Sequence, residues 1–95
     1  MRKYEIIFIV KPMEEEATNA IIEKFSNLIK KNGGTIENED RWGKKRLAYE
    51  IKDCAEGYYC LWNVACEPAC VAEADRVMKI TDEILKHMIV KSDEE

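Results

Sequence analysis

The residues with the clearest chemical potential form a basic run in the middle of the chain. The segment Arg41-Trp42-Gly43-Lys44-Lys45-Arg46 places four cations within six residues. Lysine and arginine neutralise phosphates and release counterions, which favours nucleic-acid binding. The run has a simpler interpretation as a solvated strand edge, where charge discourages aggregation. Arg2 and Lys3 add two cations near the start of the chain.

Catalytic chemistry has little support in the sequence. His87 is the only histidine, and a catalytic histidine needs a partner base or nucleophile within reach. The adjacent acids Asp82 and Glu83 are typical of solvated charges, and Gly33-Gly34 is typical of a helix stop. Nucleotide-binding loops, zinc-protease motifs and nucleophile elbows are absent from the sequence. We therefore expect no catalytic residues, no cofactor and no small-molecule substrate.

Four cysteines occur in the second half of the chain, at positions 54, 60, 66 and 70. They form no C-x2-C pair, so the common zinc and iron–sulfur spacings are missing, and we expect no metal site. Cys60 and Cys66 share the parity of one strand and are interpreted as small core residues. Reduced thiols are the expectation, and a disulfide or adventitious metal through Cys66 and Cys70 remains the alternative.

The 95-residue length fits one domain, expected over residues 1–91 with a short acidic tail at 92–95. A hydrophobic content of 46% is too high for a disordered chain. No apolar run approaches the roughly 20 residues of a membrane span, and the start does not resemble a signal peptide, so the cytoplasm is expected and no membrane partner. The net charge of −4 argues globally against nucleic acid, but acids gather at 14–16 and 93–95, leaving a locally basic surface.

Periodicity predicts two helices and four strands in the order β-α-β-β-α-β. Apolar residues recur at helical spacing over 14–31, with Ala17, Ile21, Phe25, Leu28 and Ile29 inward. A second helix begins at Pro68 and ends near Lys79. Strands are predicted at 4–10, 35–52, 58–66 and 84–91, with a turn at 53–57. The apolar parity of the long second strand changes between Trp42 and Leu47, which predicts a bulge at Gly43.

This element order is that of the ferredoxin-like α+β fold, a four-stranded antiparallel sheet with two helices on one face. The right-handed crossover rule places the first and third strands in the centre. The face without helices should be polar, yet Ile7, Ile9, Tyr59 and Leu61 fall on it. Such a face indicates a binding partner, although an ordinary mixed surface would show a similar pattern.

The sequence resembles the bacterial ribosomal protein S6 family of the small subunit. The opening 1–6, Met-Arg-Lys-Tyr-Glu-Ile, and the later Val10-Lys11-Pro12 are similar to that family's opening. The segment 42–51, Trp-Gly-Lys-Lys-Arg-Leu-Ala-Tyr-Glu-Ile, resembles its central signature, except that Glu50 stands where proline is frequent. Gly57-Tyr58-Tyr59 and Met88-Ile89-Val90-Lys91 also fit, so the resemblance spans nearly the whole chain.

The resemblance implies a ferredoxin-like fold without catalytic activity. It also implies binding to the central domain of small-subunit ribosomal RNA, jointly with ribosomal protein S18. We expect phosphate contacts from Arg2, Lys44, Lys45, Arg46 and Lys91. Weaker candidates for RNA or partner contacts are Tyr4, Tyr49, Ile7, Ile9, Tyr59 and Leu61. The alternative is a ferredoxin-like regulatory or RRM-type RNA-binding domain that acts outside the ribosome, since 57–62 loosely resembles an RRM aromatic strand.

Overall fold

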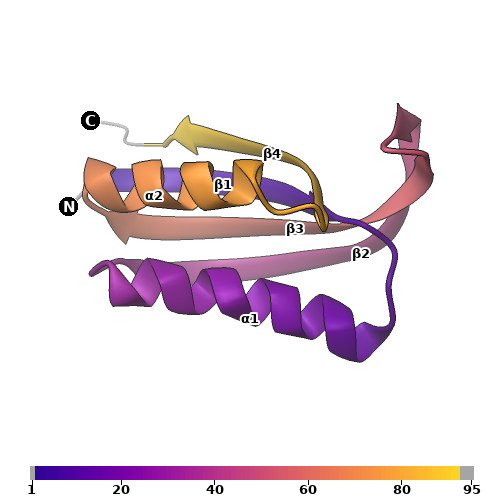
Figure 1. The fold of residues 1–95 in the computed structure, drawn as a ribbon. Helices are drawn as coiled ribbons and strands as arrows, with labels where there is room; N and C mark the ends of the chain where they lie inside the picture. The colour runs from indigo at the N-terminus through magenta and orange to yellow at the C-terminus, as the bar shows by residue number, and fades with distance from the viewer. Residues whose placement is uncertain (1, 93–95) are drawn as a thin grey trace.

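A computed structural model describes residues 2–92 and shows the predicted order of elements (Figure 1). The acidic residues 93–95 of the expected tail lie outside the described part. The sheet is antiparallel with strand order β2-β3-β1-β4, so β1 and β3 are central. This confirms the ferredoxin-like fold, with both helices on one face. The elements are β1 (Arg2–Val10), α1 (Glu15–Lys31), β2 (Thr35–Ile51), β3 (Cys54–Cys66), α2 (Pro68–Lys79) and β4 (Ile84–Lys91).

The main core lies between the sheet and the two helices. Trp62 of β3 packs edge-on against Phe8 of β1, with ring centroids 5.0 Å apart and an interplanar angle of 76°. Phe25 of α1 lies 6.4 Å from Phe8 on the helix side. Cys60 and Cys66 are fully buried in the same cluster, as their shared parity predicted. Burial of this apolar surface is the main force that holds the helices on the sheet.

Helix α1 differs from the sequence-based expectation by a small rotation. Its buried residues are Thr18, Ile22, Phe25 and Ile29, whereas Ala17 is exposed and Ile21 is only half-buried. The apolar stripe is wide enough that periodicity alone allowed either choice. The predicted glycine stop is correct. Gly33 has φ +85°, and the amides of Gly33 and Gly34 donate to the carbonyls of Lys30 and Ile29, which is a Schellman motif.

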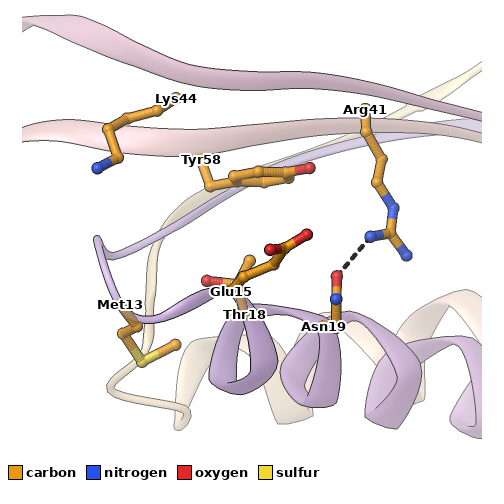
Figure 2. Close-up of a pocket in the computed structure, with 7 residues that line it drawn as sticks. All are labelled: Met13, Glu15, Thr18, Asn19, Arg41, Lys44 and Tyr58. Carbon is orange, nitrogen blue, oxygen red and sulfur yellow. Dashed lines mark hydrogen bonds between the residues drawn. The ribbon is translucent and has the colours of Figure 1, made fainter.

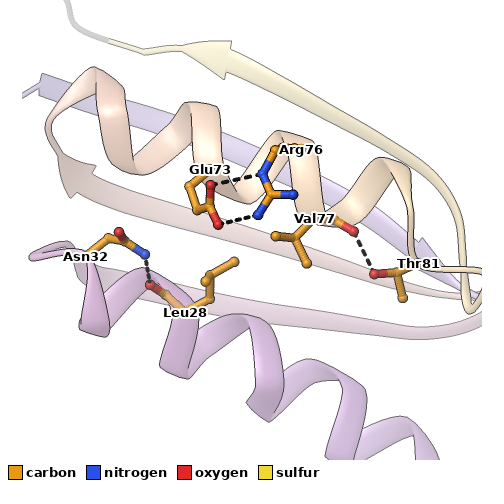
Figure 3. A network of polar contacts seen from close by, with 6 residues as sticks. All are labelled: Leu28, Asn32, Glu73, Arg76, Val77 and Thr81. Carbon is orange, nitrogen blue, oxygen red and sulfur yellow. Dashed lines mark hydrogen bonds and ion pairs between the residues drawn. The ribbon is translucent and has the colours of Figure 1, made fainter.

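Side chains also satisfy carbonyl groups near the C-terminal ends of both helices (Figure 3). Asn32 donates through Nδ2 to the Leu28 carbonyl at 2.8 Å, and Thr81 donates through its hydroxyl to the Val77 carbonyl at 2.6 Å. Each carbonyl also accepts a backbone bond, Leu28 from the Asn32 amide at 3.2 Å and Val77 from the Ile80 amide at 3.3 Å, so the side chains add a second bond where each helix ends. On the exposed side of α2, Arg76 binds Glu73 through two nitrogens.

Strand β2 contains more irregularities than the single predicted bulge. The bulge at Gly43 is confirmed, because the pairing with β3 shifts between Arg41 and Gly43 and Gly43 has φ +87°. Two further shifts occur, one between Ile36 and Asn38 and one between Arg46 and Ile51. As a result Ile36 packs on the helix-side core, whereas Trp42, with the same parity, lies on the face without helices, which we call the open face.

The β2–β3 hairpin extends beyond the helices and bends at its end (Figure 1). The predicted turn at 53–57 is wrong, because β3 already begins at Cys54. The chain reverses instead at Lys52 and Asp53, whose φ angles are 51° and 64°, a tight turn without glycine. A second, smaller core forms on the open face beneath this hairpin, and it contains Ile9, Leu47 and Leu85 with Ile51, Cys54 and Tyr59 packed against it.

Gly57 should be intolerant of a side chain, because it lies against this smaller core. A Cβ atom there would clash with Cγ2 of Ile9 and would lie 3.4 Å from Cδ1 of Leu85. We expect Gly57→Ala to lower the free energy of unfolding by about 1–3 kcal/mol, as overpacking does. Urea denaturation measures this loss. Ile9→Ala should relieve the clash, so a double variant whose loss equals the sum of the two single losses would contradict this packing.

Candidate nucleic-acid interface

The five cations expected to contact phosphate lie at opposite ends of the sheet. Arg2 pairs with Cys66 and Lys91 pairs with Tyr4, at the end where β1 begins and β4 finishes. Lys44 pairs with Tyr58, eight residues earlier along β3. At about 3.3 Å per residue, roughly 26 Å separates the two groups. The structure therefore forms two basic points rather than one patch.

The hairpin cations point to both sides of β2. Lys44 shares a side with Tyr58, which packs on the helix-side core, and Arg46 follows on that same side opposite Glu56. Lys45 pairs with Gly57 and lies toward the open face. Within residues 2–92, none of the five expected phosphate-binding cations forms an ion pair. Their charges are therefore available to an external anion.

Arg41, the first cation of the basic run, has a structural role instead. Its Nε donates to Oε2 of Glu39 at 2.9 Å, and its Nη1 donates to Oδ1 of Asn19 in α1 at 2.6 Å. The hydrogen bond to Glu39 is the main reason that the pKa of Arg41 is raised, and Tyr58 adds a smaller contribution. The bond to Asn19 ties β2 to α1 beside the cavity shown in Figure 2.

The two candidate tyrosines have very different environments. Tyr4 is 9% exposed and forms part of the core, with one side along a groove of about 470 Å³ between α2 and β4. Lys91 and His87 also line that groove, and His87 Nε2 lies 2.7 Å from Asp75 Oδ1. Tyr49 is 63% exposed on the hairpin, where Lys86 Nζ lies 5.8 Å from its ring centroid.

The open face carries the apolar surface that alternation predicted, with one residue covered. Ile9 is buried by the hairpin, while Ile7, Tyr59 and Leu61 are half-buried. Ile7 has Leu61 as its cross-strand neighbour on one side and Met88 on the other. Three exposed side chains extend this surface, and we call the whole the open-face patch: Ile7, Tyr59, Leu61, Trp42, Met88 and Val90.

Sequence reasoning did not name Trp42, Met88 or Val90 as contact residues, and Trp42 is the aromatic one among them. Its ring stacks on Tyr59 with centroids 6.2 Å apart and planes 16° apart, and its Nε1 donates to Asp40 Oδ2 at 3.0 Å. The indole is nevertheless 42% exposed. The available signal was an aromatic residue beside the cationic run. The register shift between Ile36 and Asn38 changed the face of the sheet that Trp42 occupies.

The cysteines are free thiols in the described structure, and burial disfavours the thiolate form of two of them. All four cysteines are free, and Cys60, Cys66 and Cys70 are buried. Burial raises the pKa of Cys60 and of Cys66 to about 12, which disfavours their thiolates near neutral pH. Residues 2–92 contain no group of three or more histidine, cysteine or acidic side chains placed to hold a metal ion.

Comparison with known proteins agrees with this architecture. The sequence family described as Ribosomal protein S6 matches residues 3–91. The chain belongs to the ribosomal protein S6 family. It is 49% identical over 94 residues to the small ribosomal subunit protein bS6 of Exiguobacterium sibiricum, covering 98% of this chain and 99% of that one. The bS6 protein of Desulforamulus reducens is 48% identical over 95 residues, covering 99% and 100%.

A solved structure shows the same fold. The crystal structure of the 30S ribosomal protein S6 from Thermotoga maritima superimposes with a TM-score of 0.89 at 29% identity, covering 95% of this chain and 86% of that one. The family consists of structural proteins of the small ribosomal subunit and is not an enzyme family. Within residues 2–92, neither helix combines the length and the apolar character that a membrane span requires.

The Asp75–His87 pair should make a small part of the stability of this protein pH-dependent. The hydrogen bond with His87 lowers the pKa of Asp75, and Lys79 lowers it further. A lowered carboxyl pKa stabilises the fold above the unfolded value near 3.9, and this stabilisation is lost as the pH falls through the folded value. Because the Asp75 side chain is 40% exposed, we expect less than about 1 kcal/mol.

Urea denaturation at pH 5 and pH 2 compares the wild type with Asp75→Asn. The difference in unfolding free energy between them should shrink at the lower pH, where the carboxylate of Asp75 is protonated. Asp82→Asn is the matched control, because Asp82 is exposed and forms no ion pair within residues 2–92. A difference that stays constant over this range would contradict the role of the pair.

Proposed function

We propose that this protein binds the central domain of small-subunit ribosomal RNA together with ribosomal protein S18. The observation that carries the proposal is the set of unpaired cations on the hairpin, Lys44, Lys45 and Arg46, on a chain with a net charge of −4. A chain that repels RNA globally and attracts it locally needs further positive charge from a partner. The open-face patch offers a surface for that partner.

We expect RNA to contact the two basic points in different ways. Lys45 and Arg46 belong to the projecting hairpin, whereas Lys44 also lines the cavity that is bordered by Glu15, at the acidic start of α1. Arg2 and Lys91 supply a second point of contact at the far end. Exposed Tyr49 can reach a sugar or a partner. Tyr4 is buried, and only the part of its side chain that lines the groove is accessible to RNA or a partner.

The surface proposed for the partner is the open-face patch, which exposes several neighbouring apolar side chains. Met88, Val90 and Trp42 are 48%, 43% and 42% exposed and adjoin the half-buried Ile7 and Leu61. Contiguous exposed apolar surface on a sheet is typical of a protein interface. Lys45 and Lys86 lie at the hairpin side of this surface and add positive charge beside it.

Replacing Lys44, Lys45 and Arg46 together by alanine should weaken the complex with RNA and S18. Three phosphate contacts correspond to a slope of about −2 to −3 in log K against log salt, so the variant should lose up to that much of the slope. Filter binding of a central-domain RNA fragment over a salt series, with S18 present, measures it. An unchanged slope would exclude these residues from the interface.

The same titration tests the need for the partner. Alone, the protein should bind the fragment in the non-specific range of about 10⁻⁴–10⁻⁶ M, and S18 should tighten binding at least about a hundredfold, a coupling of roughly 2.7 kcal/mol. Nanomolar binding by the isolated chain would contradict partner dependence. Co-sedimentation of the native protein with 30S particles after a moderate salt wash distinguishes this function from a role outside the ribosome.

A charge on the open-face patch should disrupt the partner complex. Met88→Glu places a carboxylate beside Ile7, and we expect it to reduce capture of S18 by at least about tenfold, or 1.4 kcal/mol. Ile80→Glu is the matched control, because Ile80 is 70% exposed at the end of α2 and away from the patch. Equal losses in the two variants would show that S18 does not use this face.

A further inference from the structure

Strand β4 forms one edge of the sheet and carries backbone groups that no strand satisfies. Within residues 2–92, β1 lies on one side of β4 and no strand lies on the other. The Ser92 amide donates to the Lys3 carbonyl at 2.9 Å, and hydrogen-bonded pairs alternate with non-bonded pairs along an antiparallel ladder. The N–H and C=O groups of His87, Ile89 and Lys91 therefore point outward, away from β1.

The side chains of the same three residues line the groove of about 470 Å³ between α2 and β4. Helix α2 runs along β4 (Figure 1), and it contributes apolar side chains from Pro68, Val71 and Ala72 to the groove. Outward backbone groups and apolar side-chain contacts thus follow one line. Several peptide-binding domains use this arrangement, in which an extended segment joins the sheet edge and its alternate side chains enter pockets.

The opposite edge of the sheet is protected against such pairing, whereas β4 is not. Strand β2 is interrupted by three register shifts and carries charged side chains along much of its length. Bulges and charges are common protections of an edge strand. In contrast, β4 keeps a continuous register with β1 from Lys86 to Lys91, and its lysines are these two end residues. The stretch between them is suited to pairing with another strand.

Charge decides which kind of strand fits this edge. Among the groove-lining residues, Asp75 is paired with His87 at 2.7 Å, whereas Lys91 forms no ion pair within residues 2–92. Strand β4 contains no acidic residue, so antiparallel pairing with a second copy would gather four lysine side chains, two of Lys86 and two of Lys91, on one ribbon. A segment that brings a carboxylate opposite Lys91 avoids this repulsion.

We propose that an extended segment of a partner protein joins β4 as a fifth, antiparallel strand. Its acidic residue lies opposite Lys91 and its apolar residues lie opposite Ile89 and His87, so that all three cover the groove, because directly opposed residues share a face. The residues between them lie beside Met88 and Val90 and enlarge the open-face patch. Lys91 is also an expected phosphate contact, so this segment and RNA compete for that cation.

The test titrates the ¹⁵N-labelled full chain with a capped peptide that contains Glu-Thr-Val-Thr-Val, whose acid and valines are placed to face the groove. The amide signals of His87, Ile89 and Lys91 should move saturably, and their exchange with solvent should slow as they become bonded. Absence of saturable movement up to about 1 mM peptide would overturn the inference. The same movement on concentrating the chain alone would show a second copy at this edge and would overturn it too.

Two modified peptides test the strand geometry. N-methylation of both valines removes backbone donors that face β4 and should weaken binding at least about tenfold, as the loss of two hydrogen bonds does. N-methylation of both threonines is the matched control, because their amides point away from β4, and it should leave binding unaltered. Equal losses for the two peptides would show that the segment does not pair with β4.

Two arginine variants of the chain locate the groove. Ala72 is exposed on α2 and lines the groove, so Ala72→Arg should fill the groove and weaken peptide binding at least about tenfold. Ala17→Arg makes the same change at an exposed position of α1 and should leave binding unaltered. Equal losses in the two variants would place the peptide elsewhere. The unfolding free energies of both variants show that each remains folded.

A charge exchange tests the contact with Lys91. Lys91→Glu should weaken binding of the acidic peptide and strengthen binding of a peptide with lysine in place of the glutamate, because the sign of the pair is reversed. Lys91 is exposed, so the fold should tolerate this change. A variant that keeps the preference for the acidic peptide would overturn the assigned direction of the strand and its charge.

The inference concerns a protein segment and does not rest on RNA binding. If the peptide fails to bind while the chain and S18 still bind the RNA fragment, the β4 edge is not a docking site and the proposed function stands. If the peptide binds with the expected pattern but the RNA fragment does not bind, the proposed function fails and the β4 edge remains a docking site.

Discussion

The alternation of side chains along β2 determines the surface chemistry of this protein. Each residue inserted into the strand moves every later side chain to the other face. The shift after Ile36 places Trp42 on the open face, and the bulge at Gly43 then returns Lys44 to the side of the helices. Without the bulge at Gly43, Lys44 would leave the cavity and Leu47 would leave the smaller core. Both proposed interfaces therefore depend on two local irregularities in a single strand.

The smaller core makes these irregularities stable. Leu47 and Leu85 cover Ile9 beneath the hairpin, so the projecting end of β2 and β3 is anchored to the central strand β1. Gly57 permits this approach because a side chain there would occupy the space of Ile9. The cations of the hairpin are consequently held on a packed element rather than on a free loop. Packing of this kind reduces the conformational entropy that binding must still remove.

Sequence reasoning recovered the features that depend on local pattern. The bounds of α2 and β4, the central position of β1 and β3, and the bulge at Gly43 all follow from periodicity, proline and glycine. The shift near Glu37 carries no glycine, and the turn at Lys52–Asp53 uses positive φ angles without one, so neither has a local signal. The cavity was not predictable, because it depends on how α1 docks and on the burial of a threonine that periodicity does not select.

The two faces of the hairpin suggest how an acidic protein can hold RNA and a partner at once. Lys44 and Arg46 lie on the side of the helices, whereas Lys45, Leu47 and Tyr49 face the open side, where the partner is proposed to bind. A partner on the open-face patch would therefore leave Lys44, Arg46 and the cavity uncovered. It would also exclude water around Lys45 and Tyr49, and charge interactions strengthen when water is displaced. Cooperative binding needs no conformational change in this arrangement, because the two ligands would meet along one strand.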